Sequence, residues 1–230
     1  MSARSHIGPA SDRSSFGALA LGLLDRAVET QGQLVQRNIT RARRRRHEAT
    51  PGQVIRTLER LYVTGQAAAG AATGGLAAAP GVGTALAAAM SGGEVLTAME
   101  LTTLFALSVA DVHGVPLDEV ERRRTLVLGL MLGGSGRQVI AKGTDRTARH
   151  WARRIVADVP MQKLHRINRV LGKHWVTKYG TKQGVLVLGK LVPFGIGFAI
   201  GGGANALLAS GCVRATRLAF GPAPKSWPAG

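Results

Sequence analysis

Two long stretches of the chain carry no charged side chain, and they restrict the fold more than any other feature. One covers the 33 residues between Arg60 and Glu94, and the other covers the 23 residues between Lys190 and Arg214. Each exceeds the ~20 residues that a helix needs to span a bilayer. Small uncharged residues favour close helix packing, because they let two helix backbones approach each other. We therefore expect an all-α fold, a single-domain helical bundle with apolar helical hairpins rich in Ala and Gly.

A break in each stretch predicts where its hairpin turns. In the first stretch the break is Pro80-Gly81, and Ala and Gly on both sides contribute little to insertion beside the ~0.3 to 0.6 kcal/mol of each Leu, Ile, Phe or Val. We expect two helices that meet at Pro80 in a buried or re-entrant hairpin. The second stretch is more hydrophobic after Pro193, and Gly197 and Gly201 permit close helix contact. For this second stretch, membrane insertion and a buried core hairpin are equal alternatives.

Positive charge is concentrated between these stretches. The chain carries 30 Lys and Arg against 13 Asp and Glu, and the net charge of +17 requires an acidic partner such as nucleic acid or anionic lipid. Residues 145–175 interleave apolar residues with cations on both sides of Pro160. They predict two basic amphipathic helices of the kind that lies on a membrane surface, with an ordinary solvated helix face as the alternative. The candidate membrane-binding or anion-binding cations are Arg149, Arg153, Arg154, Arg166, Arg169 and Lys173.

The N-terminal part is predicted to be an addition to the bundle. Residues 1–14 are polar, and we expect them to be disordered. Residues 15–49 show helical spacing of apolar residues and predict a basic amphipathic extension. A helical domain is expected over residues 50–221 and a flexible tail over residues 222–230. The extension ends in a second group of candidate anion-binding residues, which are Arg43, Arg44, Arg45 and Arg46.

Three local signals predict helix starts within the domain. The segment Thr50-Pro51-Gly52-Gln53 has a hydroxyl cap, a proline at the first helical position and a glutamine three residues after the cap. Ser91-Gly92-Gly93-Glu94 predicts a second start. Pro116, which is followed by acidic residues, predicts a third, because carboxylates favour the first turn of a helix.

No motif in the chain predicts catalysis, a metal site or a cofactor. The segment from Gly184 to Lys190 has the spacing of a phosphate-binding loop, but Leu191 follows where a Ser or Thr should hold magnesium. Six scattered histidines form no metal-binding pair, and Cys212 is the single cysteine. Glu100 and Asp111 share a helix face and are candidate buried acidic groups, which would serve an ion path in lipid. The alternatives are that they pair with arginines such as Arg122 to Arg124 or simply face water. We expect a protein that is not an enzyme and holds no cofactor.

Several patterns in the chain resemble the EcsC family of bacterial proteins. They are Gly74-Gly75-Leu76, the Pro80-Gly81 break, the Leu-rich helix closing at His113-Gly114-Val115-Pro116, the segment from Lys190 to Gly197 with Asn205, and the ending from Val213 to Phe220. The resemblance covers residues 55–221 in broad terms. It implies a helical bacterial protein of a family named for a member encoded beside an ABC transporter, and it supplies no catalytic residues.

Together these features predict an accessory protein at the cytoplasmic face of the cell membrane, peripheral or partly inserted. The expected partners are anionic lipid or a membrane protein. The resemblance implies a link to transport and a transporter component as a partner, and a second copy of the chain is a further candidate. The alternative is a soluble nucleic-acid-binding protein, which the charge favours but the scarcity of aromatic residues for base stacking does not.

Overall fold

The protein is all-helical over the part that the computed structural model describes, which is residues 21–29, 32–44, 48–77, 84–115, 117–144, 150–189 and 196–228. No strand occurs within these ranges, so the predicted all-α class is confirmed. One short helix covers residues 21–29. The helices after it are α2 (Gly32–Arg44), α3 (Pro51–Ala77), α4 (Thr84–Val112), α5 (Val120–Leu132), α6 (Gly134–Thr144), α7 (Trp151–Asp158), α8 (Met161–Gly189) and α9 (Ile196–Phe220).

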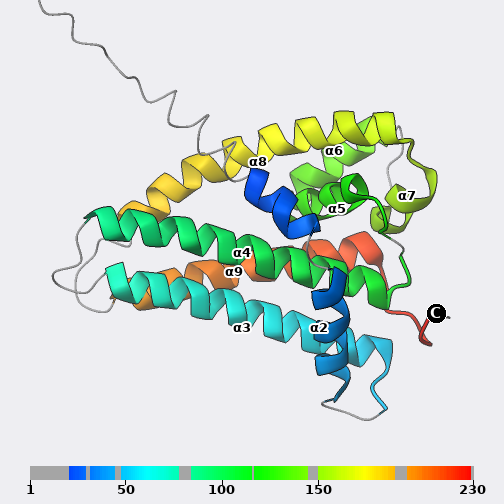
Figure 1. The fold of residues 1–230 in the computed structure, drawn as a ribbon, viewed down its shortest axis with the longest axis horizontal. Coiled ribbons are helices and arrows are strands. Elements are labelled where there is room, and N and C mark those ends of the chain that lie inside the picture. Colours follow the sequence, from blue (N-terminus) through cyan, green and yellow to red (C-terminus); the bar gives the residue numbers. More distant parts are fainter. Residues whose placement is uncertain are drawn as a thin grey trace, which may run out of the picture.

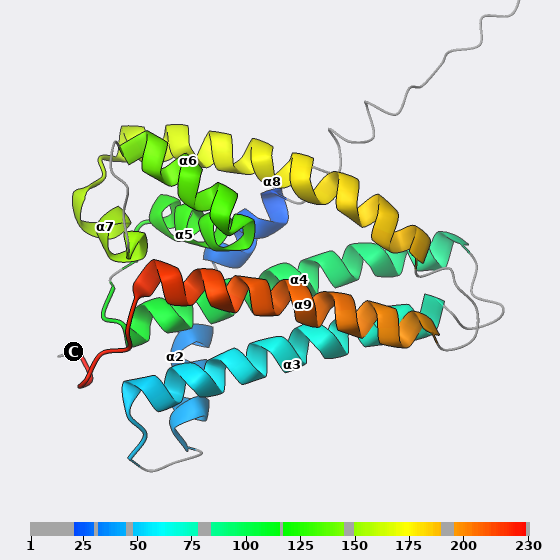
Figure 2. The same cartoon turned by 180° about the vertical axis from the view of Figure 1, so that it is seen from behind.

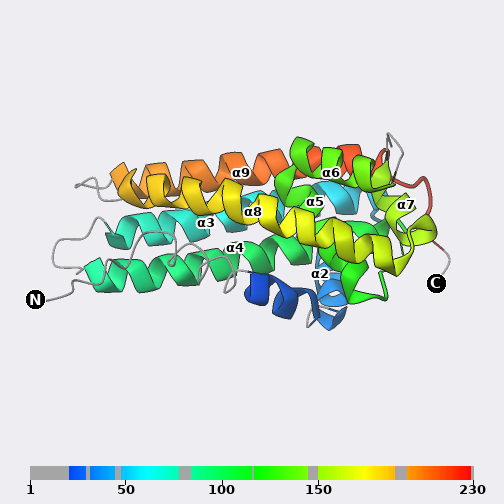
Figure 3. The same ribbon diagram turned by 90° about the horizontal axis from the view of Figure 1, so that it is seen from above.

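Three long helices, α3, α4 and α9, lie side by side along the long axis of the molecule (Figures 1 and 2). Helices α5 and α6 form a second layer, and α8 covers that layer from outside (Figure 3). Helix α2 packs against α3 and α4 on the side opposite to α8 (Figure 1). One cluster of buried apolar side chains connects these layers, from Leu24 near the N-terminus to Phe220 at the end of α9.

Helices α3 and α9 pack closely through small residues. A Cβ atom added at Gly202 would lie 3.1 Å from the Ala67 carbonyl oxygen and 3.2 Å from the Ala71 Cβ. A larger side chain at Gly202 would therefore force the two helices apart. The surroundings of Gly197 and Gly201, which belong to the same helix, and the position of Pro193 lie outside the described residues.

The first charge-free stretch forms the end of α3 and the start of α4. These helices flank Pro80 and Gly81, which lie outside the described residues. The helix start predicted at Ser91 to Glu94 is wrong, because α4 already begins at Thr84. Four alanines lie between Thr84 and Ser91, and their high helix propensity outweighs the glycine pair that follows. Within the described residues, no helix combines the length and the apolar character that crossing a membrane requires.

The other two predicted helix starts have different outcomes. At Thr50 the reciprocal cap is present, since Gln53 N–H donates to Thr50 Oγ1 over 3.4 Å and Thr50 N–H donates to Gln53 Oε1 over 3.1 Å. The start predicted at Pro116 is wrong, because α5 begins only at Val120. The Arg123 guanidinium donates to the carbonyl oxygen of Leu117 over 2.5 Å, which holds the segment before α5 outside the helix.

The predicted N-terminal extension is part of the bundle. It is divided into the helix of residues 21–29 and α2, with residues 30–31 between them outside the described part. The apolar stripes of both pieces enter the common core, where Leu24 and Val28 have no exposed surface and Val35 and Ile39 are also buried. Residues 1–14 lie outside the described range.

The C-terminal tail, predicted to be flexible over residues 222–230, contacts the bundle through Trp227 and Pro228. The Trp227 indole N–H donates to the Ala49 carbonyl oxygen over 3.2 Å, and the Arg43 guanidinium lies 4.3 Å from the centroid of the Trp227 ring. A Cβ atom added at Gly114 would also lie 2.8 Å from the Pro228 Cβ. A partly buried indole with a cation on its face holds the tail against the bundle, as expected for an aromatic anchor.

Candidate functional site

Helix α8 presents a basic face to solvent. Its apolar side packs on α5 and α6 through Leu164, Ile167, Leu171 and Trp175, each at most 4% exposed. The opposite side carries exposed cationic side chains, and we define the α8 basic face by four of them, Lys163, Arg166, Arg169 and Lys173. Because α8 is the outer layer of the molecule, this face points away from the bundle (Figures 1 and 3).

A buried polar contact fixes the rotation of α8 about its own axis. Asn168 is only 3% exposed, and its amide donates to the Glu121 carbonyl oxygen over 3.0 Å. Its side-chain oxygen accepts a hydrogen bond of 2.7 Å from the Thr125 hydroxyl. A rotation of α8 would leave these buried polar groups unpaired, which costs about 1–3 kcal/mol for each group. The basic face is therefore held outward by the core.

The α8 basic face has little neutralising charge. The sequence of α8 contains no acidic residue. Among the described residues, Arg166, Arg169 and Lys173 form no ion pair or hydrogen bond through their side chains. The carboxylate beside this helix, Glu121, is engaged on its flank, where it contacts Asn168 and lies 3.4 Å from the His165 ring nitrogen. The positive potential of the face thus remains open to an external anion.

The apolar sides of α7 and α8 are not available to a lipid phase, contrary to the predicted surface-lying amphipathic helices. Trp151 and Ile155 of α7 are 4% and 2% exposed and belong to the same core as the apolar side of α8. Arg153 is exposed, and its guanidinium donates to His113 Nδ1 over 3.2 Å. The side chain of Arg154 and all of Arg149 lie outside the described residues.

The second predicted group of cations lies elsewhere. Arg43 and Arg44 are exposed at the end of α2, on the side of the bundle opposite to α8 (Figure 1). Arg43 is engaged with Trp227 of the tail. Arg45 and Arg46 lie outside the described residues. The structure therefore separates the two groups, and one flat surface cannot contact both.

Glu100 and Asp111 are both exposed, which agrees with the alternative in which they face water and not with buried acidic groups. They lie on the solvent-exposed side of α4 and not on its packed side. Asp111 Oδ1 accepts a hydrogen bond of 3.1 Å from the Gln36 amide of α2. Partial loss of water around the carboxylate raises the pKa of Asp111, and the Gln36 hydrogen bond opposes that shift. Neither residue forms a buried ion path within the described part of the bundle.

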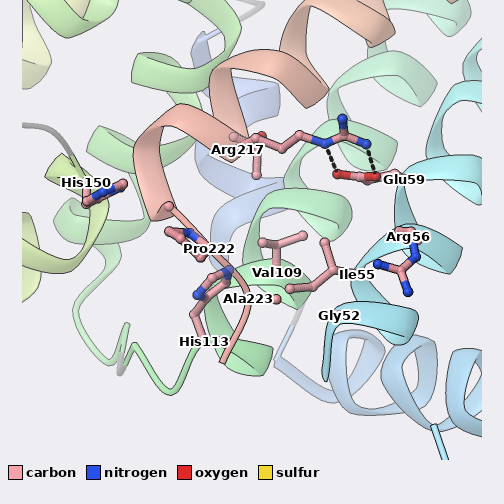
Figure 4. A pocket seen from close by; sticks show the side chains of 12 residues that line it. Gly52, Ile55, Arg56, Glu59, Val109, His113, His150, Arg217, Pro222 and Ala223 are labelled. Carbon is pink, nitrogen blue, oxygen red and sulfur yellow. Dashed lines mark hydrogen bonds and ion pairs between the residues drawn. The ribbon is translucent and has the colours of Figure 1, made fainter. Parts of the chain in front are cut away.

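Sequence reasoning missed a cavity of about 550 Å³ at one end of the long helices (Figure 4). Glu59 of α3 and Arg217 of α9 line it and form a two-bond ion pair, with Nε to Oε1 at 2.7 Å and Nη2 to Oε2 at 2.6 Å. The Glu59 side chain is 8% exposed, whereas that of Arg217 is 62% exposed. One signal was available, because Glu59 follows the buried Ile55 and Leu58 on the apolar stripe of α3 and needs a partner there.

The described residues contain no group of three His, Cys, Asp or Glu side chains arranged to hold a metal ion. Complete burial raises the pKa of the Cys212 thiol to about 11. The thiol is therefore neutral near pH 7 and packs as a small apolar side chain.

Comparison of the chain with protein-family models, with curated proteins and with solved structures found no match. The resemblance to the EcsC family therefore remains a hypothesis from the sequence, and the function is argued from the geometry of the described residues.

Proposed function

We propose that the protein is a membrane-associated accessory protein that binds an anionic lipid surface through the α8 basic face. The observation that carries this proposal is a row of outward cations on a helix without an acidic residue, three of them unpaired among the described residues. A cation near an anionic leaflet contributes about 1 kcal/mol. Three to four such side chains are enough for reversible attachment.

Attachment through charge suits the way in which α8 is packed. Its apolar side holds the core together, so the part offered to a membrane is the cationic side with Val170, which is 42% exposed, between the cations. The charge-free parts of α3, α4 and α9 meet at one end of the molecule, where α3 and α8 end and α4 and α9 begin (Figure 1). In this proposal, that end of the molecule makes a second contact with the membrane, as expected for the predicted glycine-rich hairpins.

Co-sedimentation with vesicles tests the proposal. The protein should pellet with vesicles that contain phosphatidylglycerol and remain in solution with vesicles of phosphatidylcholine alone. Adding salt should release it, because the Debye length falls from about 10 Å at 0.1 M to about 3 Å at 1 M. Equal binding to both vesicle types, or resistance to salt and carbonate, would show that charge on α8 is not the main attachment.

Duplex DNA is the control for the alternative function. A basic surface also attracts phosphates of nucleic acid, and such binding weakens steeply with salt. Tight binding to DNA without binding to anionic vesicles would replace the membrane proposal by the nucleic-acid one.

A further inference from the structure

The cavity beside the Glu59–Arg217 pair is built by segments distant in the sequence. Helix α3 supplies Gly52, Ile55 and Arg56 in addition to Glu59, α4 supplies Val109, and the turn after α4 supplies His113. The start of the C-terminal tail, residues 221–223, forms another wall (Figure 4). The cavity has a volume of about 550 Å³, which lies in the range of small-ligand pockets, ~300 to 1,000 Å³.

Free hydrogen-bond donors outnumber free acceptors among the charged side chains of this cavity. Both oxygens of Glu59, the one carboxylate in its lining, already accept hydrogen bonds from Arg217. These bonds use Nε and Nη2 of Arg217, so its Nη1 keeps its donors. Arg56 is exposed and forms no side-chain ion pair or hydrogen bond with the described residues. Arg56 is therefore a free guanidinium in the lining, whereas Nη1 of Arg217 points away from Glu59 and the other labelled side chains (Figure 4).

His113 adds a second donor. A guanidinium can only donate, so the contact of 3.2 Å from Arg153 requires His113 Nδ1 to accept and places the ring proton on Nε2. Burial lowers the pKa of His113 to about 4, and the charge of Arg153 lowers it further in the same direction. The ring also stacks on Phe220 with centroids 5.0 Å apart. His113 is thus a neutral N–H donor in a fixed orientation.

We propose that this cavity binds a small phosphate monoester that carries a compact apolar group. The donors of Arg56 on α3 and of His113 in the turn after α4 come from separate elements, and the Arg217 guanidinium adds positive charge, which suits a tetrahedral dianion better than a planar carboxylate. The apolar group would contact Ile55 and Val109, which also line the cavity. The Glu59–Arg217 pair fastens α9 to α3 and holds Arg217 in position.

Calorimetric titration with phenyl phosphate tests this site in the full-length chain. R56Q should weaken binding roughly tenfold, because it removes a charge-assisted hydrogen bond. The matched control is R60Q, which removes another exposed arginine one turn further along α3, outside the cavity. It should leave the affinity unchanged. A223F, which fills the cavity from the exposed tail, should remove binding while circular dichroism shows an unchanged fold.

The same chemistry occurs in a free phosphate monoester and in the headgroup of phosphatidic acid. If the source is a lipid, R56Q should weaken binding to vesicles with phosphatidic acid and leave binding to phosphatidylglycerol vesicles unchanged. If the source is a free molecule, R56Q should affect phenyl phosphate alone. The site would be overturned if phenyl phosphate does not bind, if R56Q and R60Q behave alike, or if A223F has no effect. These outcomes do not depend on the α8 basic face, which is intact in all three variants.

Discussion

Replacing Gly136 with alanine should lower the free energy of unfolding by about 3 kcal/mol, at the upper end of the range for overpacking. Gly136 is buried where α6 crosses α5, and a Cβ atom there would lie 2.9 Å from the Gly129 Cα and within overlap distance of the Gly129 carbonyl oxygen. Both are backbone atoms, which no rotamer change can move aside. Thermal unfolding followed by circular dichroism should show a fall in Tm of roughly 10 °C.

The control for this change is G203A. Gly203 also lies inside a helix, but it is exposed on α9 and no atom lies within 4 Å of an added Cβ. Alanine should raise the free energy of unfolding by about 0.5–1 kcal/mol there, because it reduces the backbone freedom of the unfolded chain. Similar losses in both variants would contradict the close crossing of α5 and α6.

Neutralising the α8 basic face should produce the largest loss of vesicle binding. The triple variant R166Q/R169Q/K173Q removes three exposed cations, each worth about 1 kcal/mol near an anionic leaflet. The partition coefficient on phosphatidylglycerol vesicles should therefore fall about 100-fold, since 1.4 kcal/mol corresponds to a factor of ten. Flotation of the vesicles over a range of lipid concentrations measures this coefficient. The fold should stay intact because the three side chains form no ion pair or hydrogen bond with the described residues.

The matched control is R37Q/R41Q/R44Q on α2. It removes three exposed arginine charges from the opposite side of the bundle, the same number of charges as the α8 variant removes (Figure 1). If net charge alone attracted the protein to the membrane, both triple variants would lose binding equally. We expect the α2 variant to keep nearly all of its affinity.

Local signals in the sequence were reliable where neighbouring residues decide the structure. The cap at Thr50 depends on Gln53 three residues later. The start of α5 could not be predicted in this way. It depends on the guanidinium of Arg123, which holds the carbonyl oxygen of Leu117 outside the helix.

The candidate sites were predictable only in part, because their geometry depends on tertiary contacts. Spacing alone placed Arg166, Arg169 and Lys173 on one side of a helix. The contacts of α8 with α5 and α6 decide whether its apolar or its basic side faces outward. The spacing of residues in the sequence does not reveal these contacts. The pairing of Glu59 with Arg217 joins residues far apart in the sequence, and no local spacing connects them.

A site-specific probe on the bound protein tests the orientation of α8 most directly. Val170 lies within the α8 basic face and Leu34 lies on α2, and they are similarly exposed at 42% and 44%. Because the single native cysteine, Cys212, is buried, V170C and L34C can each carry a fluorescent label selectively. On phosphatidylglycerol vesicles, the label at position 170 should become shielded from an aqueous quencher while the label at position 34 stays accessible. Equal accessibility at the two positions, or shielding at position 34 alone, would contradict the proposal that α8 faces the membrane.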